Sequence, residues 1–323
     1  MKNFLNFFTL VLALAMNANL VLADWPIKVF APYMYVGSGD QFQITQCDDA
    51  CGLKYYTLAF IISDKLGNPA WDGRIPMDQN FYADQINAIR ARGGDVIVSF
   101  GGEAGTEMAL ADKDAASLEA DYQSIIDRYK LTWLDFDIEG RALRNTAANQ
   151  RRNAALAELQ KKNHGLIISY TLPVDPNGLD KNSIELLTDA VAKGLQVHSV
   201  NIMTMDFGPY FSRGKKMSDV SIVSALKAYQ QCQSIDPSIL IGLTPMIGQN
   251  DEKTEIFTQD DARALENWAS SHSWVCSMSF WSVNRDAGNP GKKNNNTHSG
   301  IQQEPWEFSN IFQTFIAGSA EHH

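Results

Sequence analysis

The chain has 323 residues, of which 45% are hydrophobic and 20% are charged, a composition ordinary for a soluble globular protein of one large domain or two small ones. Its formal net charge of -10 at pH 7 and its pI near 5.1 argue against nucleic acid or an anionic membrane surface as a partner. A neutral or cationic substrate fits this charge.

The N-terminus is predicted to be a secretory signal over residues 1–23. Lys2 precedes an apolar run at 10–15, and small or apolar residues suited to cleavage end at Ala23. The apolar run is too short to span a membrane. We therefore expect residues 24–323 to be the mature protein, which would be secreted to the extracellular space as a soluble monomer without a membrane anchor.

Strand-like and helix-like segments alternate through the mature chain. The predicted strands are 27–36, 55–62, 95–100, 131–140, 166–172, 197–205, 240–246 and 275–281. The predicted helices are 81–92, 115–129, 149–163, 183–193, 220–232, 260–270 and 304–316. Several strands are nearly continuous apolar runs, as expected when both faces of a parallel sheet are buried. The pattern predicts an α/β fold, a single-domain (β/α)8 TIM barrel. An open doubly wound sheet is the second choice, since no G-x-G-x-x-G follows the first strand.

Four cysteines are present, an even number that suggests disulfides in an oxidising compartment. Cys47 and Cys51 lie close together in a predicted loop, where a local disulfide is the preferred interpretation. Cys232 and Cys276 either pair with each other or remain buried thiols. No histidine stands at ligand spacing near these cysteines, so a zinc site is not predicted.

The fourth predicted strand carries an acidic face. Apolar and acidic residues alternate with period two, which sends Asp135, Asp137 and Glu139 to the side opposite Leu134 and Phe136. Three carboxylates so close together disfavour joint ionisation, so at least one should keep a proton near neutral pH. Such a carboxyl is suited to general acid catalysis. Two other interpretations are a solvated sheet edge and a divalent metal site.

Polar, small and aromatic residues gather at the ends of the predicted strands, where a barrel of this type places its chemistry. The candidate residues there, besides the acidic strand, are Tyr33, Gly101, Gly102, Met205, Asp206, Gln249 and Trp281. Few histidines or further carboxylates converge, so we predict no metal site and no cofactor. Aromatic rings with amide donors suit a sugar, whose apolar face stacks and whose hydroxyls form hydrogen bonds.

Four sequence motifs resemble those of glycoside hydrolase family 18, the chitinases. Asp135-x-Asp137-x-Glu139 resembles the end of the family's D-x-x-D-x-D-x-E signature, and Ser99–Gly102 resembles its S-x-G-G. Met203–Asp206 resembles its M-x-Y-D in the M-T-M-D form of bacterial-type chitinases, and Trp281 matches the tryptophan that ends the eighth strand. The motifs stand at four strand ends in the family's order, and the resemblance spans nearly the whole mature chain.

Two positions depart from the family's pattern. Thr132 replaces the first aspartate of the signature, at the far end of the strand. Met205 stands where many members carry a tyrosine that assists at the reacting sugar. Tyr210 is a candidate to supply the missing hydroxyl.

The resemblance implies roles for individual residues. Glu139 would be the general acid, Asp137 would orient the acetamido group of the sugar, and Asp135 would share a proton with Asp137. Trp281 would stack beneath the reacting ring, while Asp206 and Gln249 would bind its polar groups. The implied activity is that of a secreted, endo-acting chitinase that cleaves β-1,4-linked N-acetylglucosamine in chitin or chito-oligosaccharides with retention and without a metal. Alternatives are an endo-β-N-acetylglucosaminidase acting on N-glycan cores and a non-catalytic chitin-binding lectin.

Overall fold

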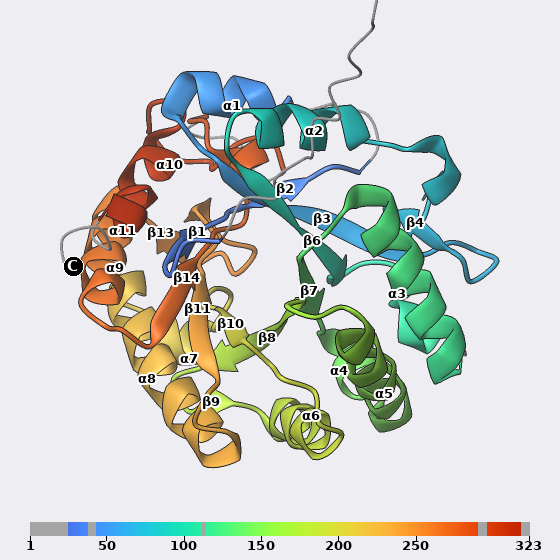
Figure 1. The fold of residues 1–323 in the computed structure, drawn as a ribbon. Helices are drawn as coiled ribbons and strands as arrows, with labels where there is room; N and C mark the ends of the chain where they lie inside the picture. The colour runs from blue at the N-terminus through green and yellow to red at the C-terminus, as the bar shows by residue number, and fades with distance from the viewer. Residues whose placement is uncertain (1–24, 38–42, 112–113, 290–295, 318–323) are drawn as a thin grey trace, which may run out of the picture.

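The computed structural model describes residues 25–37, 43–111, 114–289 and 296–317. Its parallel strands form a closed barrel with helices around the outside (Figure 1). The predicted signal, residues 1–23, lies outside the described ranges. Within those ranges, no helix is long and apolar enough to cross a membrane.

The barrel strands follow one another in chain order around the sheet. They are β1 (Val29–Phe30) with β2 (Tyr33–Tyr35), β3 (Tyr55–Ser63), β6 (Asp95–Gly101), β7 (Trp133–Asp137), β8 (Ile167–Asp175), β10 (Ser199–Met203), β11 (Leu240–Thr244) and β14 (Val275–Met278). All of their pairings with one another are parallel. Because β1 pairs with β14 while β2 pairs with β3, the sheet closes on itself. The predicted single-domain (β/α)8 barrel is confirmed.

The first barrel strand is divided into two short pieces, whereas the sequence predicts one run over 27–36. Pro32 lies between the pieces, and proline has no N–H to donate to a strand ladder. The chain changes partner at this point: Ala31 donates its N–H to Met278 O, and Pro32 O accepts the N–H of Thr57. The break therefore transfers the strand from β14 to β3.

Helices and short strands fill the connections between the barrel strands. The helices are α1 (Ile44–Cys51), α2 (Ala83–Ala91), α3 (Ala115–Tyr129), α4 (Gly140–Leu143), α5 (Thr146–Lys162), α6 (Lys181–Ala192), α7 (Pro209–Ser212), α8 (Met217–Ile235), α9 (Gln259–Ser270), α10 (Glu307–Phe312) and α11 (Thr314–Ala317), with 3-10 turns η1 (Met77–Gln79), η2 (Met108–Leu110) and η3 (Val283–Arg285). The additional strands are β4 (Pro69–Trp71), β5 (Ile75–Pro76), β9 (Gly178–Leu179), β12 (Gly248–Gln249) and β13 (Ile256–Phe257). Between β11 and α9, a segment described throughout, the β12–β13 hairpin is the only added element.

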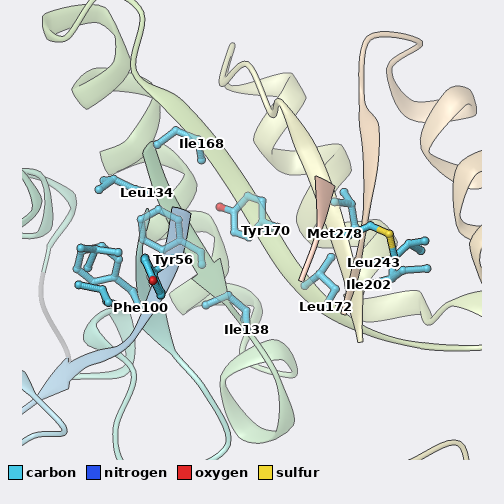
Figure 2. Close-up of a cluster of buried hydrophobic side chains, with 14 of the residues drawn as sticks. Tyr56, Phe100, Leu134, Ile138, Ile168, Tyr170, Leu172, Ile202, Leu243 and Met278 are labelled. Carbon is cyan, nitrogen blue, oxygen red and sulfur yellow. The ribbon is translucent and has the colours of Figure 1, made fainter. Parts of the chain in front are cut away.

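The core between barrel and helices is formed by the apolar faces of the strands (Figure 2). Leu134, Phe136 and Ile138 are fully buried in it, as the alternation in β7 predicts. Phe136 stacks on its register neighbour Phe100 at a ring-centroid distance of 5.1 Å, and Tyr122 of α3 meets both rings edge-on. This packing fixes which face of β7 points outward, and therefore directs its carboxylates to the barrel interior.

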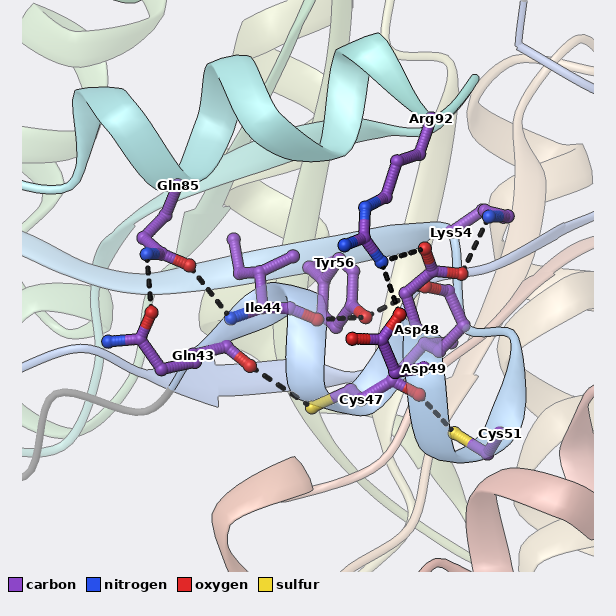
Figure 3. A network of polar contacts seen from close by, with 11 residues as sticks. Gln43, Ile44, Cys47, Asp48, Asp49, Cys51, Lys54, Tyr56, Gln85 and Arg92 are labelled. Atoms are coloured by element: carbon purple, nitrogen blue, oxygen red, sulfur yellow. Dashed lines mark hydrogen bonds and ion pairs between the residues drawn. The ribbon is translucent and has the colours of Figure 1, made fainter.

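The segment with the first two cysteines forms helix α1, so the predicted loop is wrong (Figure 3). Cys47 and Cys51 are both free thiols on successive turns of that helix, so the predicted disulfide is not formed. The Cys51 thiol donates to Cys47 O at 3.0 Å, and the Cys47 thiol approaches Gln43 O at 3.9 Å. Each sulfur is thus directed toward the carbonyl of the preceding turn. Cys232 and Cys276 are buried free thiols, the second of the two alternatives.

Candidate active site

A cavity of about 700 Å³ opens where the barrel strands end, within the usual range for small-molecule sites. Ends of β6, β7, β10 and β11 contribute Gly101, Asp137, Met203 and Thr244 to its wall. The predicted site residues that line it are Tyr33, Gly101, Asp137, Glu139, Met205, Asp206 and Trp281. Residues far apart in the sequence therefore meet in one place, as the barrel topology requires.

Asp135 lies below the cavity, where hydroxyl groups surround its carboxylate. Its neighbours in register on β6 and β8 are Ser99 and Ser169, and each donates a hydrogen bond of 2.7 Å. Tyr33 and Thr171 donate two more, at 2.8 and 2.9 Å. Burial raises the pKa of Asp135, whereas these hydroxyls favour its ionised form and lower it. On balance the pKa of Asp135 stays above its usual value, and the four donors offset part of the cost of burying its anion beneath the site.

Asp137 and Glu139 form a coupled pair above Asp135. Burial raises the pKa of Asp137 well above its usual value, and the charges of Glu139 and Asp135 raise it further. Burial also raises the pKa of Glu139 to about 7, with a further contribution from Glu103. The two carboxyl groups hydrogen-bond to each other. Because they interact so strongly, the proton belongs to the pair, which retains it at neutral pH.

One oxygen of Asp137 is left without a hydrogen bond in a residue that lines the cavity. Asp137 is 5% exposed, and its Oδ1 is buried without a hydrogen-bond partner among the described residues. A buried acceptor left unsatisfied is costly, by about 1–3 kcal/mol. Since Asp137 also lines the cavity, a donor on a bound molecule would satisfy this oxygen.

Four aromatic side chains pack together as one wall of the cavity. Trp281 stacks on Phe60 at a centroid distance of 5.7 Å and an interplanar angle of 10°. Tyr33 and Tyr35 lie against Trp281 at 6.0 and 6.3 Å. All four residues line the cavity, where the half-buried Trp281 presents a flat apolar surface. Such a surface is suited to the apolar face of a sugar ring.

The two predicted glycines act by leaving space. A β-carbon on Gly101 would stand 2.1 Å from the carbonyl oxygen of Asp137, and one on Gly102 would stand 2.7 Å from the ring of Phe60. Gly101 therefore permits close packing behind the catalytic candidate, and Gly102 permits the position of the aromatic wall. Gly102 does not itself line the cavity.

Gln249 and Tyr210 are not where the sequence analysis expected them. Gln249 is absent from the cavity wall, and its side-chain N–H groups are directed to backbone carbonyls of its own hairpin, including Glu255 O at 2.9 Å. The prediction that it contacts a sugar is corrected: Gln249 holds the hairpin together. Tyr210 is 88% exposed, packs on Phe211 and does not line the cavity, so it supplies no hydroxyl at Met205.

Several cavity residues were not selected from the sequence. They are chiefly Glu103, Thr171, Asp251, Glu252 and Arg285. Arg285 is fully buried and donates to Ile247 O and Gln249 O, and burial lowers its pKa to about 10. Glu103 lies close after the end of β6, a signal that could have identified it, whereas Arg285 lies in η3, beyond the end of β14. Within the described residues, no three His, Cys, Asp or Glu side chains are arranged to hold a metal ion.

Comparisons with known proteins agree with this geometry. The chain is 32% identical over 320 residues to the probable bifunctional chitinase/lysozyme of Escherichia coli (strain K12), covering 90% of this chain and 35% of that protein. It is 32% identical over 285 residues to endochitinase 11 of Metarhizium anisopliae, covering 81% of this chain and 53% of that one. The chain thus spans between about a third and about half of the length of these relatives.

A solved structure matches over almost its whole length. Catalytic site mutants of active domain 2 of the thermostable chitinase from Pyrococcus furiosus, complexed with chito-oligosaccharides, superpose with a TM-score of 0.84 at 32% identity, covering 94% of this chain and 98% of that one. The model of the family "Glycosyl hydrolases family 18" matches residues 33–310, which include the barrel strands from β2 to β14. The chain therefore belongs to glycosyl hydrolases family 18.

Proposed function

We propose that this protein is a chitinase, which hydrolyses β-1,4-linked N-acetylglucosamine in chitin or chito-oligosaccharides. The observation that carries the proposal is the proton-sharing pair of Asp137 and Glu139 at the cavity wall, where Trp281 also presents its ring. The chito-oligosaccharide complex of the similar Pyrococcus furiosus domain supports the same substrate class. Glu139 gives a reason to prefer an enzyme over a lectin, because sugar binding alone does not need an acid with a raised pKa.

In the proposed mechanism, Glu139 protonates the glycosidic oxygen as the bond to the leaving sugar breaks. The acetamido carbonyl oxygen of the same sugar attacks the anomeric carbon from the opposite side and forms an oxazolinium ion. Glu139, now ionised, removes a proton from water, which opens the oxazolinium at the anomeric carbon. Two displacements at one carbon give net retention. No metal takes part in these steps.

Asp137 is proposed to orient the acetamido group. Its unpartnered Oδ1 is positioned to accept the N–H of that group, which directs the carbonyl oxygen toward the anomeric carbon. Its negative charge would then stabilise the positive charge of the oxazolinium. The Asp135 anion below it strengthens this effect, because repulsion between the two favours keeping a proton or a cation near Asp137.

An endo mode of action and export are further parts of the proposal. The connection from β11 to α9 adds only a short hairpin, so that connection contributes no extra domain that would wall in a chain end. An open cleft favours cuts within a polymer. Residues 1–23 have the features of a secretory signal, and export would bring the enzyme to an extracellular polymer. We expect the protein to act as a monomer.

The decisive experiment measures turnover of a chito-oligosaccharide by the purified protein without added metal, with product lengths resolved. Glu139→Gln should bind the oligosaccharide but lose activity by orders of magnitude. Glu266→Gln is the matched control, because Glu266 is a buried glutamate of α9 that does not line the cavity.

Other outcomes select other functions. Saturable binding without turnover by the wild type would identify a lectin. Cleavage restricted to N-glycan cores would identify an endo-β-N-acetylglucosaminidase. Wild-type turnover retained in Glu139→Gln would refute the proposed acid. Products released only from chain ends would refute the endo mode.

A further inference from the structure

The β12–β13 hairpin is built around Glu255, a residue that no sequence motif identifies. Glu255 precedes β13, and its backbone carbonyl accepts from the Gln249 side chain at 2.9 Å and from Asn250 N at 3.1 Å. Asn250 in turn donates from its side chain to Met246 O and Gly248 O, at 2.8 and 3.2 Å. The hairpin is therefore a firmly tied unit next to the end of β11.

The side chain of Glu255 points away from the hairpin and accepts hydrogen bonds from the turn that follows β10. Glu255 is fully buried, and its two carboxylate oxygens accept the N–H groups of Phe207 and Gly208 at 3.1 and 2.8 Å. A carboxylate that accepts from two successive backbone N–H groups holds both peptide planes at once, and such charge-assisted bonds are stronger than neutral ones. The turn from 207 to 208 is thus fixed by a residue almost fifty positions away in the chain.

Asp206 lies directly before this turn and depends on its geometry. It has φ 50, a left-handed conformation that residues other than glycine rarely adopt. Its carboxylate accepts Glu252 N at 2.6 Å, and its own N–H approaches the Asn250 side chain at 3.5 Å. Both contacts come from the hairpin, so Asp206 is held from the same side as Phe207 and Gly208.

The position of Asp206 matters to the site because Asp206 lines the cavity with Glu139. We propose that Glu255 is a positioning residue for substrate binding, which holds the turn after β10 so that Asp206 faces the sugar bound in the cavity. This inference rests on the proposed chitinase activity. The same inference gives Gln249 an indirect role: it does not touch the cavity, but it ties the hairpin from which Glu255 projects.

The central test is Glu255→Gln, which keeps the shape of the side chain but turns one acceptor into a donor that faces a backbone N–H. We expect KM for a chito-oligosaccharide to rise about three- to tenfold, the scale of one lost hydrogen bond. The value of kcat should change less than KM. Amide hydrogen exchange at Phe207 and Gly208 should become faster. Glu266→Gln, the buried control on α9, should leave KM and this exchange unchanged.

A double-mutant cycle between Glu255 and Asp206 distinguishes the positioning role of Glu255 from a purely structural one. If Glu255 acts through Asp206, then Glu255→Gln should raise KM in the wild type but add little in an Asp206→Asn background.

The alkaline limb of the pH profile of kcat/KM is a second readout. Asp206 is among the groups that raise the pKa of Glu139, together with Glu103, while Asp137 lowers it by a hydrogen bond. If Glu255→Gln displaces Asp206, the pKa of Glu139 should fall and the alkaline limb should move to lower pH. Asp251 and Arg285, which face Asp206, are unchanged in all of these variants.

Each result counts for or against the proposal. Full additivity in the cycle, or a stability loss with KM unchanged, would overturn it. If Glu255→Gln does not fold, Glu255→Asp keeps the charge but is too short to hold both N–H groups, and the same KM shift is expected. If the wild type shows no turnover, the chitinase proposal fails. The positioning role is then judged by the affinity of the oligosaccharide for wild type and Glu255→Gln, where equal affinities would overturn it.

Discussion

Gly101 and Asp137 are register neighbours on β6 and β7, and a β-carbon on Gly101 would stand 2.1 Å from the Asp137 carbonyl oxygen. Gly101 also has φ +103, a conformation that side chains rarely adopt. Gly101→Ala should therefore push β7 away at the residue that orients the acetamido group. We expect a stability loss of more than about 2 kcal/mol and a fall in kcat of at least about tenfold. Thermal unfolding and steady-state kinetics measure the two effects.

The matched control for this glycine is Gly93, which also has a positive φ but no atom within 4 Å of an added β-carbon. Gly93→Ala should cost only the backbone penalty, about 1 kcal/mol, and leave kcat unchanged. Equal losses in the two variants would show that backbone conformation, rather than contact with Asp137, makes Gly101 necessary.

The pH dependence of activity should follow the protonation of Glu139, the proposed general acid. Since Glu139 must be protonated to act and its pKa is raised to about 7, kcat/KM should fall as the pH rises above about 7. Glu103→Gln removes a negative charge that raises this pKa, so the alkaline limb should move to lower pH. Glu185→Gln, on the exposed surface of α6, is the control. A limb that stays in place in Glu103→Gln would contradict the electrostatic role of Glu103.

Stability should also depend on the protonation of Glu139. A carboxyl with a raised folded-state pKa stabilises the fold below its unfolded pKa, about 4.5 here, and this contribution is lost as the pH rises through about 7. Complete loss corresponds to on the order of 3 kcal/mol. Glutamine does not titrate, so Glu139→Gln should gain stability relative to the wild type between about pH 5 and about pH 8. Denaturant unfolding at each pH measures the difference, and a difference that is constant with pH would refute the raised pKa.

The aromatic wall should contribute to substrate affinity. Trp281→Ala removes the ring that faces the cavity and should raise KM for a chito-oligosaccharide about tenfold or more. Trp268→Ala on α9 removes a half-buried indole that packs against His272 and Trp274, away from the cavity wall, and should leave KM unchanged. An unaltered KM in a folded Trp281→Ala would place the sugar elsewhere.

Local rules were sufficient for the centre of the site. The period-two alternation in β7 predicted that Asp135 and Asp137 share a face, because successive side chains of a regular strand point to opposite faces. The topology then predicted that strand ends meet, which brings Asp137, Asp206 and Trp281 to one cavity. Neither step requires knowledge of distant contacts.

The errors arose where distant contacts decide the outcome. Gln249 has the chemistry of a sugar-binding amide, but carbonyls across its hairpin engage it. Cys47 and Cys51 have the spacing of a local disulfide, but burial of Ile44 and Cys47 against the core organises their segment as a helix. Glu255 lacks any motif, because its partners at Phe207 and Gly208 are joined to it only by the fold. Composition and spacing do not contain such pairings.

The pairing of β1, the piece of the first strand before Pro32, with β14 determines when the barrel can close during synthesis. Val29 and Phe30 of β1 pair with Ser277 and Met278 of β14, so the barrel cannot close until β14 has left the ribosome. A contact of such high sequence separation forms late and slowly. The nascent chain must therefore remain an open, unclosed barrel until the segment that contains β14 has been synthesised.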